Sequence, residues 1–438
     1  MYSPIKYNFV VMSDDLFQRI PAAARALLKA VSNLAEKQGV VLYIVGGFVR
    51  DLKLGISSTD YDLVVVGDAV KLARALRKSY GGDLRVHKRF GTANWTVTSV
   101  KSNLVQTLQD FADEAINISE LPELLDFVTA RSESYTQPAA LPKVQPGDMQ
   151  ADLARRDFTV NTFALPLSEA VSEILSVPEA QQDLDQGLIR VLHDQSFIDD
   201  PTRIFRAVRY EQRLGFEIEP HTLELLQAAL PYIAELSGDR IRHELDHIIL
   251  EVERIAILER LDDLGVLAAI DQDLVLNATV RAGLGRLPGD TENADMAYVT
   301  WLAYLPQEDI QRIAARLQFS TELTEASLAA SKLKSDLPDL SEASPSQLVK
   351  CLEHVPDLAL KAMTYVLEDA NQKRLVENYL NDWVDIKARA DGHTLKERGL
   401  EPGPRYKEIL TTLRSAWLDG EVSTPEEEEV LLERLLND

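Results

Sequence analysis

The chain has 438 residues, of which 45% are hydrophobic and 26% are charged, as in an ordinary globular protein. This length exceeds what one hydrophobic core organises, so we expect two to four domains. The sequence contains no apolar run of 18 residues, no signal-peptide pattern and one cysteine, Cys351. These observations argue against a transmembrane helix, a membrane partner and a disulfide framework, and we expect a cytoplasmic protein.

Charge is unevenly distributed along the chain. The net charge is −24, yet the first 100 residues contain 14 Lys and Arg against 8 Asp and Glu, a balance of +6, so the other 338 residues carry −30. An acidic protein is poorly suited to extended, sequence-independent binding of nucleic acid. A basic N-terminal part can still contact phosphates over limited patches.

The first 167 residues alternate between predicted helices and strands. The expected elements are, in chain order, 22–37 (helix), 41–45 and 60–66 (strands), 68–80 (helix), 84–89, 93–99 and 124–130 (strands). An apparent insertion at 102–121 separates two strands, and a loop at 137–147 precedes a helix that begins near Leu153. This alternation predicts a mixed α/β domain built on a small sheet.

From residue 168 onward the pattern predicts helices and no convincing strand. Apolar residues recur every three or four positions in the segments 201–214, 221–235, 239–264 and 322–334. The last 90 residues also have a helical pattern, which Pro402-Gly403-Pro404 interrupts. We therefore expect an α/β head followed by an all-α remainder.

Two glycines and two aspartates form the most informative motif. Gly46 and Gly47 end a predicted strand and let backbone N–H groups approach phosphates, beside the positive charge of Arg50. Asp60 and Asp62 stand at i and i+2 of the next predicted strand, so their side chains share a face. Carboxylates are ligands that Mg²⁺ shares with waters and substrate phosphates. The alternative is a glycine turn followed by a strand with two solvated acids.

A third acid, Asp126, lies in a strand-like run downstream of the first two. On an adjacent strand it could complete a metal site and help to polarise an attacking hydroxyl. From spacing alone, a single acid on a strand edge explains it nearly as well. Arg131 and Glu133 follow at i and i+2 and could pair with each other or reach the 137–147 loop.

A polar cluster follows at 155–161. We expect Asp157 and Asn161 to share a helical face at i and i+4, beside Arg155 and Arg156. Arginines suit a triphosphate, whereas Asp and Asn suit ribose hydroxyls. A salt-bridged surface helix is the equally weighted alternative.

The last motif is an arginine-rich helix that begins after Asp200-Pro201. A helix cap explains this Asp and Pro, but it does not call for Arg203, Arg206 and Arg209 along one face. Asp200 and Arg203 together present one acceptor-only and one donor-only group. Cytosine and adenine, with an amine beside ring acceptors, fit this edge. Uracil and guanine would place a carbonyl oxygen against the carboxylate.

Taken in order, these motifs resemble the class II tRNA nucleotidyltransferase family, which includes CCA-adding, CC-adding and A-adding enzymes and bacterial poly(A) polymerases. The motifs that carry the resemblance are GGFVRD, DYD, LDFVTAR, RRDFTVN and DDPTRIFRAVRYEQRLGF. The match runs from about 41 to 245 and returns faintly at 391–424. The resemblance implies a DNA polymerase beta-like head at 1–167, with a helical neck, body and tail at 168–250, 251–345 and 346–438.

The resemblance also implies roles for individual residues. Asp60 and Asp62 would hold catalytic Mg²⁺ ions, and Asp126 matches a further carboxylate. The implied nucleotide-binding residues are Gly46, Gly47 and Arg50 for the triphosphate, Arg156, Asp157 and Asn161 for sugar and phosphates, and Asp200 with Arg203 for the base. Arg206 and Arg209, on the same helix, are assigned to the same nucleotide site. The body and tail would hold tRNA.

The implied activity is template-independent addition of C and A, from CTP and ATP, to the 3′ end of tRNA. The 137–147 loop favours addition of the terminal A, so we expect full CCA synthesis, with A-adding close behind and CC-adding also open. Rivals are a poly(A) polymerase, a catalytically silent tRNA-binding relative and a nucleotidyltransferase for small molecules. Two departures from the family are Asp199, where Glu is usual, and the long insertion at 102–121.

Overall fold

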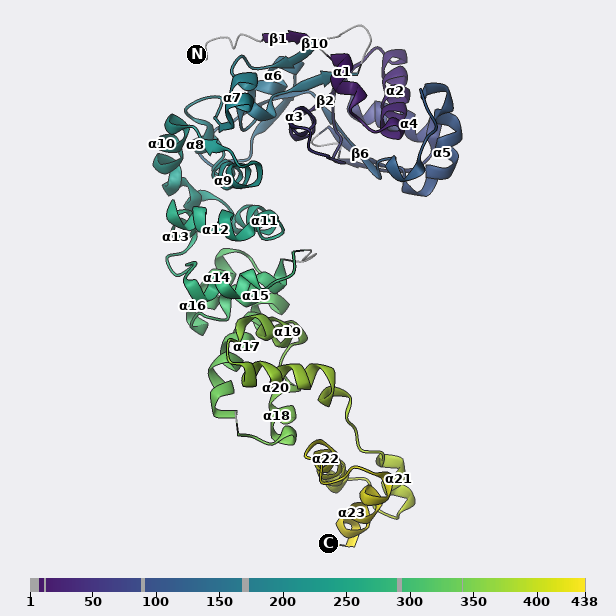
Figure 1. Ribbon diagram of the computed structural model, residues 1–438, viewed down its shortest axis with the longest axis vertical. Coiled ribbons are helices and arrows are strands. Elements are labelled where there is room, and N and C mark those ends of the chain that lie inside the picture. Colours follow the sequence, from purple (N-terminus) through teal and green to yellow (C-terminus); the bar gives the residue numbers. More distant parts are fainter. Residues whose placement is uncertain are drawn as a thin grey trace. The chain divides into compact units, whose positions relative to one another are not determined.

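The computed structural model describes residues 8–11, 13–87, 91–167, 173–289, 294–340 and 342–437. The chain forms two compact units, Met1–Leu236 and Ser237–Asp438. The first unit contains a mixed sheet with covering helices, and the second is built from helices (Figure 1). The mixed head followed by helices confirms the predicted fold class.

The described residues of the first unit form an eight-stranded sheet in the order β1-β10-β9-β2-β3-β6-β5-β4. In that order the strands are β1 (Asn8–Val11), β10 (Glu173–Ser176), β9 (Ala164–Pro166), β2 (Val41–Val45), β3 (Asp62–Val66), β6 (Leu124–Thr129), β5 (Thr92–Thr96) and β4 (Asp83–His87). β3 and β6 pair in parallel, and the other neighbours pair antiparallel. The sheet is therefore larger than the sequence suggested.

Alternation along β6 separates the two faces of the sheet. Leu125 and Phe127 are fully buried on the face against which α4 (Ala69–Tyr80) packs, while α2 (Ala22–Lys37) packs against α4 and β2. Asp126 lies between them in the sequence and so points to the opposite face. On that face α6 (Met149–Ala154) contributes Met149 to a hydrophobic cluster that includes Val64. One face of the sheet is thus fully covered, whereas the other is covered only beside the polar residues that include Asp126.

Three short strands contradict the expectation that no strand occurs after residue 168. They are β10 and the parallel pair β11 (Leu188–Ile189) and β12 (Glu217–Ile218). β10 joins the sheet by pairing with β1, far away in the sequence. Strands of two to four residues are too short to show a two-residue period, so the sequence pattern could not reveal them.

Two predicted helices were also wrong. The helix expected near Leu153 is α6, which ends at Ala154, so Asp157 and Asn161 lie on no α-helix; a 3₁₀ turn at Thr159–Asn161 follows. The single helix expected at 239–264 is two, α11 (Gly238–Ile249) and α12 (Arg254–Asp263). The predicted strand at 84–89 is β4, and its residues 88 and 89 lie outside the described residues.

The insertion folds back onto α2. It contains α5 (Lys101–Leu108) and short 3₁₀ turns, all of which contact α2. Arg25 of α2 is 7% exposed; it donates to the backbone oxygens of Gln18 (2.9 Å) and Ile20 (3.1 Å) and pairs with Glu114 (3.2 Å). Lys29, one helical turn later, pairs with Asp113 at 2.8 Å. The two ion pairs connect the insertion to α2, whereas the backbone contacts of Arg25 connect α2 to the residues just before it.

Helices complete both units. The remaining α-helices of the first unit are α1 (Ser13–Gln18), α3 (Gly47–Leu54), α7 (Ala180–Gln186), α8 (Ser196–Asp199), α9 (Thr202–Leu214) and α10 (Pro220–Ala229). Those of the second unit after α12 are α13 (Val266–Ile270), α14 (Ala278–Gly285), α15 (Asp295–Leu302), α16 (Gln307–Arg316), α17 (Thr321–Asp336), α18 (Pro345–Leu352), α19 (Asp357–Val366), α20 (Ala370–Asn381), α21 (Gly392–Glu397), α22 (Pro404–Leu418) and α23 (Pro425–Asn437). Within the described ranges, no helix has the length and apolar character needed to cross a bilayer.

The contacts of Arg25 predict a larger contribution to stability than that of Lys29. Arg25→Ala leaves two backbone carbonyls without their donor, so we expect it to reduce the free energy of unfolding by about 1–3 kcal/mol. Lys29→Ala removes a solvent-exposed ion pair and should cost less than about 1 kcal/mol. Urea unfolding of both variants, with limited proteolysis of 101–121, tests this. Equal destabilisation by the two variants would contradict it.

Candidate active site

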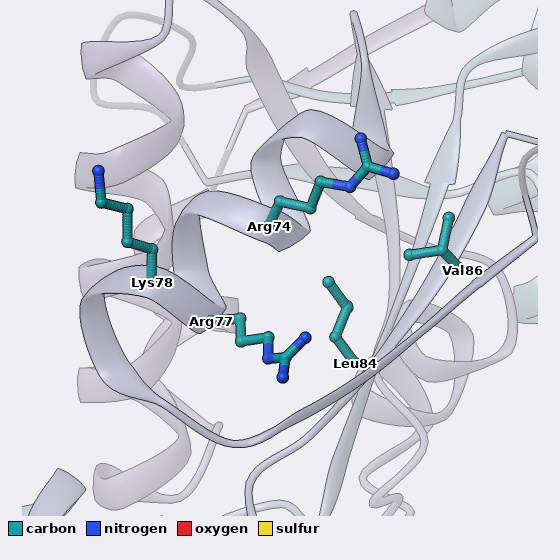
Figure 2. Close-up of a pocket in the computed structure, with 5 residues that line it drawn as sticks. All are labelled: Arg74, Arg77, Lys78, Leu84 and Val86. Carbon is teal, nitrogen blue, oxygen red and sulfur yellow. The ribbon is translucent and has the colours of Figure 1, made fainter.

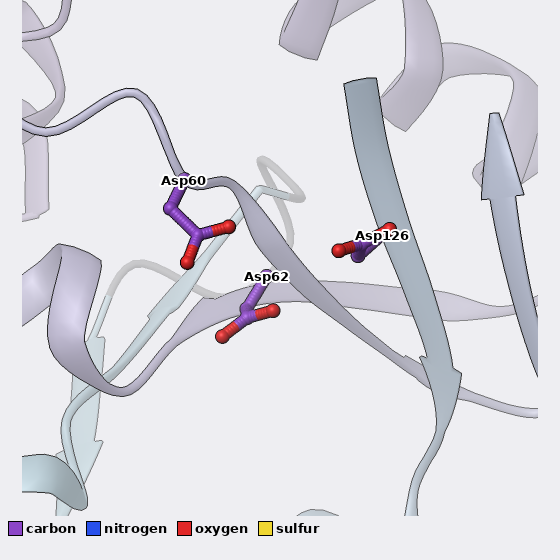
Figure 3. A group of neighbouring side chains, drawn as sticks. All are labelled: Asp60, Asp62 and Asp126. Atoms are coloured by element: carbon purple, nitrogen blue, oxygen red, sulfur yellow. The ribbon is translucent and has the colours of Figure 1, made fainter. Parts of the chain in front are cut away.

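Three carboxylates converge where β3 and β6 begin. Asp62 and Asp126 are register partners of these parallel strands, and Asp60 lies two residues before β3 rather than inside it. One oxygen from each of the three lies within 4.8 Å of the others (Figure 3). Figure 3 shows Asp60 on the incoming loop, with Asp62 and Asp126 on the two strands. The predicted grouping of the three acids is thus present in the structure.

Burial and the charge of neighbouring acids raise the pKa values of Asp60 and Asp62. Burial, followed by the charge of Asp60, raises the pKa of Asp62 to about 6, although Arg156 partly opposes this. Burial and the charge of Asp126 likewise raise the pKa of Asp60. Within the described residues, the carboxylates of Asp60 and Asp62 accept no hydrogen bond. Converging, uncompensated carboxylate oxygens are the donor set that a hard divalent cation such as Mg²⁺ prefers, so these residues fit such an ion.

Asn94 belongs to the same cluster and was missed from the sequence. It is the register partner of Asp126 on β5, and its side-chain amide donates to a carboxylate oxygen of Asp126. This hydrogen bond fixes the direction of Asp126. The signal was present in the alternation of Thr92, Asn94 and Thr96 with buried Ala93 and Trp95. That alternation places Asn94 on the polar face of β5.

The glycine turn packs against Arg156. Gly46 precedes α3 with φ of +71° and ψ of −134°, and a Cβ built on it would lie 2.7 Å from Nη1 of Arg156. Nη1 and Nη2 of Arg156 donate to the backbone oxygen of Asn161 (3.3 Å) and to Asp152 (3.1 Å). Its Nε is buried and has no hydrogen-bond partner in the described residues. The turn, the arginine and, through its charge, Asp62 therefore form one site.

Arg50, Asp157 and Asn161 form a buried polar network. Arg50 is 1% exposed; it pairs with Asp51 (2.6 Å) and donates to Asn161 Oδ1 (2.7 Å). Asn161 donates in turn to Asp157 (3.0 Å), which also accepts from Arg206 (2.6 Å). Burial alone would raise the pKa of Asp157, but Arg206 and Asn161 hold it well below its usual range. In this structure the network connects α3 to α9.

At the start of α9, Asp200 and Arg203 are both held in fixed positions. Asp200 accepts from the backbone N–H (3.1 Å) and the hydroxyl (2.6 Å) of Thr202. Arg203 is 5% exposed and donates to Ser196 Oγ (2.6 Å) and the backbone oxygen of Arg155 (2.8 Å). Further along the same helix, Arg209 is also buried, and its guanidinium lies 5.5 Å from the ring centre of Tyr210.

Two acids hold the arginines in place, of which the sequence analysis named Glu133 and missed Asp152. Asp152 is fully buried and accepts from Arg155 (2.7 Å) and Arg156 (3.1 Å). Glu133 pairs with Arg131 (2.9 Å) and Arg155 (3.3 Å), so the expected pairing of Arg131 with Glu133 is confirmed. A buried Asp within an amphipathic helix carries no local sequence signal for this role.

Comparison with known proteins gives consistent matches. Models described as "Poly A polymerase head domain" and "Probable RNA and SrmB- binding site of polymerase A" match residues 42–190 and 215–274. An A-adding tRNA nucleotidyltransferase of Halalkalibacterium halodurans is 30% identical over 409 residues, covering 92% of this chain and 90% of that protein. Another, from Geobacter sulfurreducens, is 31% identical over 446 residues and 95% of this chain, which spans 48% of that longer relative.

A solved structure also matches almost the whole chain. It is a CCA-adding enzyme in its apo form II, with a TM-score of 0.79 and 26% identity. The match covers 98% of this chain and 99% of that one.

The close approach of Arg156 to the glycine turn predicts a large effect of Gly46→Ala. Gly55, at the other end of α3, is the comparison site, because its φ is also positive (+74°) and a Cβ added there would have no atom within 4 Å. With ψ of +19° it is in the left-handed α region, where strain should cost Gly55→Ala about 1–2 kcal/mol. Gly46→Ala should cost at least about 1 kcal/mol more, because its ψ of −134° is open essentially to Gly and because Arg156 must also move. Thermal and urea unfolding measure the difference; equal losses would contradict the argument.

The raised pKa of Asp62 predicts a stability that depends on pH. Because the folded state binds this proton more tightly than the unfolded chain, stability falls as the pH rises from about 4 to about 6. At pH 7.5 without metal, Asp62→Asn should therefore stabilise the protein by about 1–3 kcal/mol, and at pH 4 the gain should vanish. Added Mg²⁺ should stabilise the wild type more than Asp62→Asn. Thermal unfolding at both pH values, with and without Mg²⁺, tests this; a gain independent of pH would refute it.

Proposed function

Because the chain belongs to the tRNA nucleotidyltransferase and poly(A) polymerase family, we propose that it adds nucleotides to the 3′ end of tRNA without a template. The observation that carries this proposal is the convergence of Asp60, Asp62 and Asp126 at one end of two parallel strands. An RNA-binding protein without catalytic activity has no need for three converging acids. The helical segments 251–345 and 346–438 would hold the tRNA.

In the proposed reaction, the 3′-hydroxyl of the RNA attacks the α-phosphate of ATP or CTP, and pyrophosphate leaves. Mg²⁺ held by Asp60 and Asp62 would, when bound, favour ionisation of the hydroxyl and neutralise the leaving group. Asn94 keeps Asp126 directed at the same place. The backbone N–H groups of the glycine turn and the guanidinium of Arg156 bind the triphosphate. These donors offset the negative charge of the triphosphate during transfer.

The buried network gives the remaining residues positioning roles in this proposal. Arg50, Asp157 and Asn161 direct their polar atoms toward one another and so hold the glycine turn against α9. Asp200 and Arg203 select the base, with a carboxylate that accepts from the amine of cytosine or adenine and a guanidinium that donates to the ring. Both side chains are already oriented by protein contacts, which reduces the entropy lost when a base binds.

The proposed product is a tRNA that carries the terminal A. Addition of A alone is favoured by the two relatives at 30–31% identity, because both are named A-adding enzymes. Addition of the complete CCA is the second candidate, favoured by the match of nearly the whole chain to a CCA-adding enzyme structure. Both candidates require the same acids and the same base-selecting helix.

Nucleotide incorporation tests the activity and its product together. A tRNA transcript ending at the discriminator base, after C or after CC is incubated with CTP, ATP or both, in the presence of Mg²⁺. Extension of the CC-ended form alone indicates an A-adding enzyme, and completion of the bare end indicates a CCA-adding one. No incorporation on any end would refute the proposed function, and long tails from ATP alone would indicate a poly(A) polymerase instead.

Substitution of Asp60 links that activity to the carboxylates. We expect Asp60→Asn to lower kcat by at least about 10²-fold, since it weakens binding of the cation that would stabilise the anionic transition state. Folding should persist, because the Asp60 carboxylate makes no structural hydrogen bond in the described residues. Asp68→Asn is the control. Asp68 lies outside the site, and Asn can replace it as the N-cap of α4. Full activity of Asp60→Asn would rule out this residue as a metal ligand.

A further inference from the structure

A group of cations lies on α4 beside the edge strand β4. Arg74, Arg77 and Lys78 of α4, with Leu84 and Val86 of β4, line a hollow of about 550 Å³ (Figure 2). Figure 2 shows the three cationic side chains on the helix and the two apolar side chains on the strand opposite. All three cations are exposed to solvent. The hollow thus has a basic wall and an apolar wall.

These cations differ from most arginines of the first unit because they lack acidic partners. Arg25, Arg50 and Arg206 each pair with a carboxylate. Within the described residues, by contrast, the side chains of Arg74, Arg77, Lys78 and of Arg85 on β4 form no ion pair or hydrogen bond. The segment 69–87 contains five Lys and Arg against one acid in a chain whose net charge is −24. Such a concentration of unpaired positive charge in an acidic protein suits a polyanionic partner.

The register of the sheet connects this basic group to the active site. Asp62 is the partner of Asp126, Asp126 of Asn94, and Asn94 of Arg85. Register partners on adjacent strands point to the same face, so Arg85 lies on the face that carries the acids. At about 4.8 Å per strand, its Cα is roughly 14 Å from that of Asp62. The row therefore runs from the carboxylates to Arg85 on the last strand of the sheet, and the cations of α4 lie on the other face of that strand, beside Leu84 and Val86.

We propose that Arg74, Arg77, Lys78 and Arg85, which we name the basic edge, bind the phosphate backbone of the RNA behind its reacting 3′ end. The proposal rests on the proposed function and adds the path along which the RNA reaches the site. A single nucleotide bound at the glycine turn would leave the basic edge unused, because Arg85 lies three strands away from Asp62. A chain of phosphates, in contrast, extends from the acids across β5 and β4 to α4. Repulsion by the acids would keep RNA phosphates off the metal site until metal is bound.

Direct RNA binding tests the proposal independently of activity. The triple variant Arg74→Gln/Arg77→Gln/Lys78→Gln removes exposed charges and keeps good helix formers. We expect its affinity for a fluorescent tRNA transcript, measured by anisotropy near 0.1 M salt, to fall roughly tenfold. The slope of log K against log salt should fall by about 1 for each RNA phosphate that the variant no longer neutralises. Arg85→Gln should act in the same direction. In incorporation assays the KM for tRNA should rise, whereas the KM for ATP should stay unchanged.

A matched control separates this effect from a general loss of charge. Lys37 of α2, like Lys78 of α4, is an exposed lysine in the last turn of its helix. Lys37→Gln should leave tRNA affinity and its salt slope unchanged. If wild-type protein binds tRNA through the basic edge but incorporates nothing, the proposed function fails and the RNA surface stands. Unchanged tRNA binding by the triple variant overturns the proposal that the basic edge binds RNA. The same holds if the variant binds tRNA normally but loses binding to anionic vesicles or to an acidic protein.

Discussion

The parallel pairing of β3 with β6 is the constraint on which the active site depends. This pairing places Asp62 directly beside Asp126, and the loop before β3 brings Asp60 to the same place. Like charges at this separation repel, so the arrangement is unfavourable for the isolated protein; burial, followed by the charge of Asp60, raises the pKa of Asp62 to about 6. The packing of Leu63, Val65, Leu125 and Phe127 on the opposite face supplies the free energy that holds the strands together despite this repulsion. A bound cation would relieve the repulsion between the carboxylates, and this relief would add to its affinity for the site.

Several arginines of the first unit form ion pairs inside the protein, whereas those of the basic edge do not. Arg50, Arg155 and Arg206 are bonded to acids inside the protein, where they connect the glycine turn, the 155–161 segment and α9. Removing one partner of such a buried pair leaves an uncompensated charge, so the network acts as one unit. Arg156 belongs partly to this network, yet its Nε is left without a hydrogen-bond partner in the described residues. Arg156, with this unpartnered Nε, contacts the glycine turn and acts on Asp62 through its charge.

Whether a contact could be predicted from the sequence depends on how far apart its two residues lie along the chain. The acids and the glycine turn follow from spacing within short segments, and the resemblance to a family added Asp126. The pairing of β1 with β10 involves residues more than 160 positions apart in very short strands, so local periodicity could not predict it. The break between α11 and α12 contains neither glycine nor proline, and Leu250-Glu251-Val252-Glu253 continues a helical pattern. Asp152 and Asn94 gain their roles from partners brought together only by the fold.

The charge distribution acquires a structural meaning once the sheet register is known. Sequence analysis located an excess of +6 in the first 100 residues, and most of it lies in the segment 69–87 at one edge of the sheet. Strong acidity elsewhere disfavours indiscriminate contact with RNA, because most of the chain repels phosphates. In this proposal attraction is then confined to the basic edge, at the far end of the row that begins at Asp62. Such a division lets a strongly acidic protein bind a polyanion in one orientation, with the RNA terminus at the carboxylates and its backbone over the basic edge.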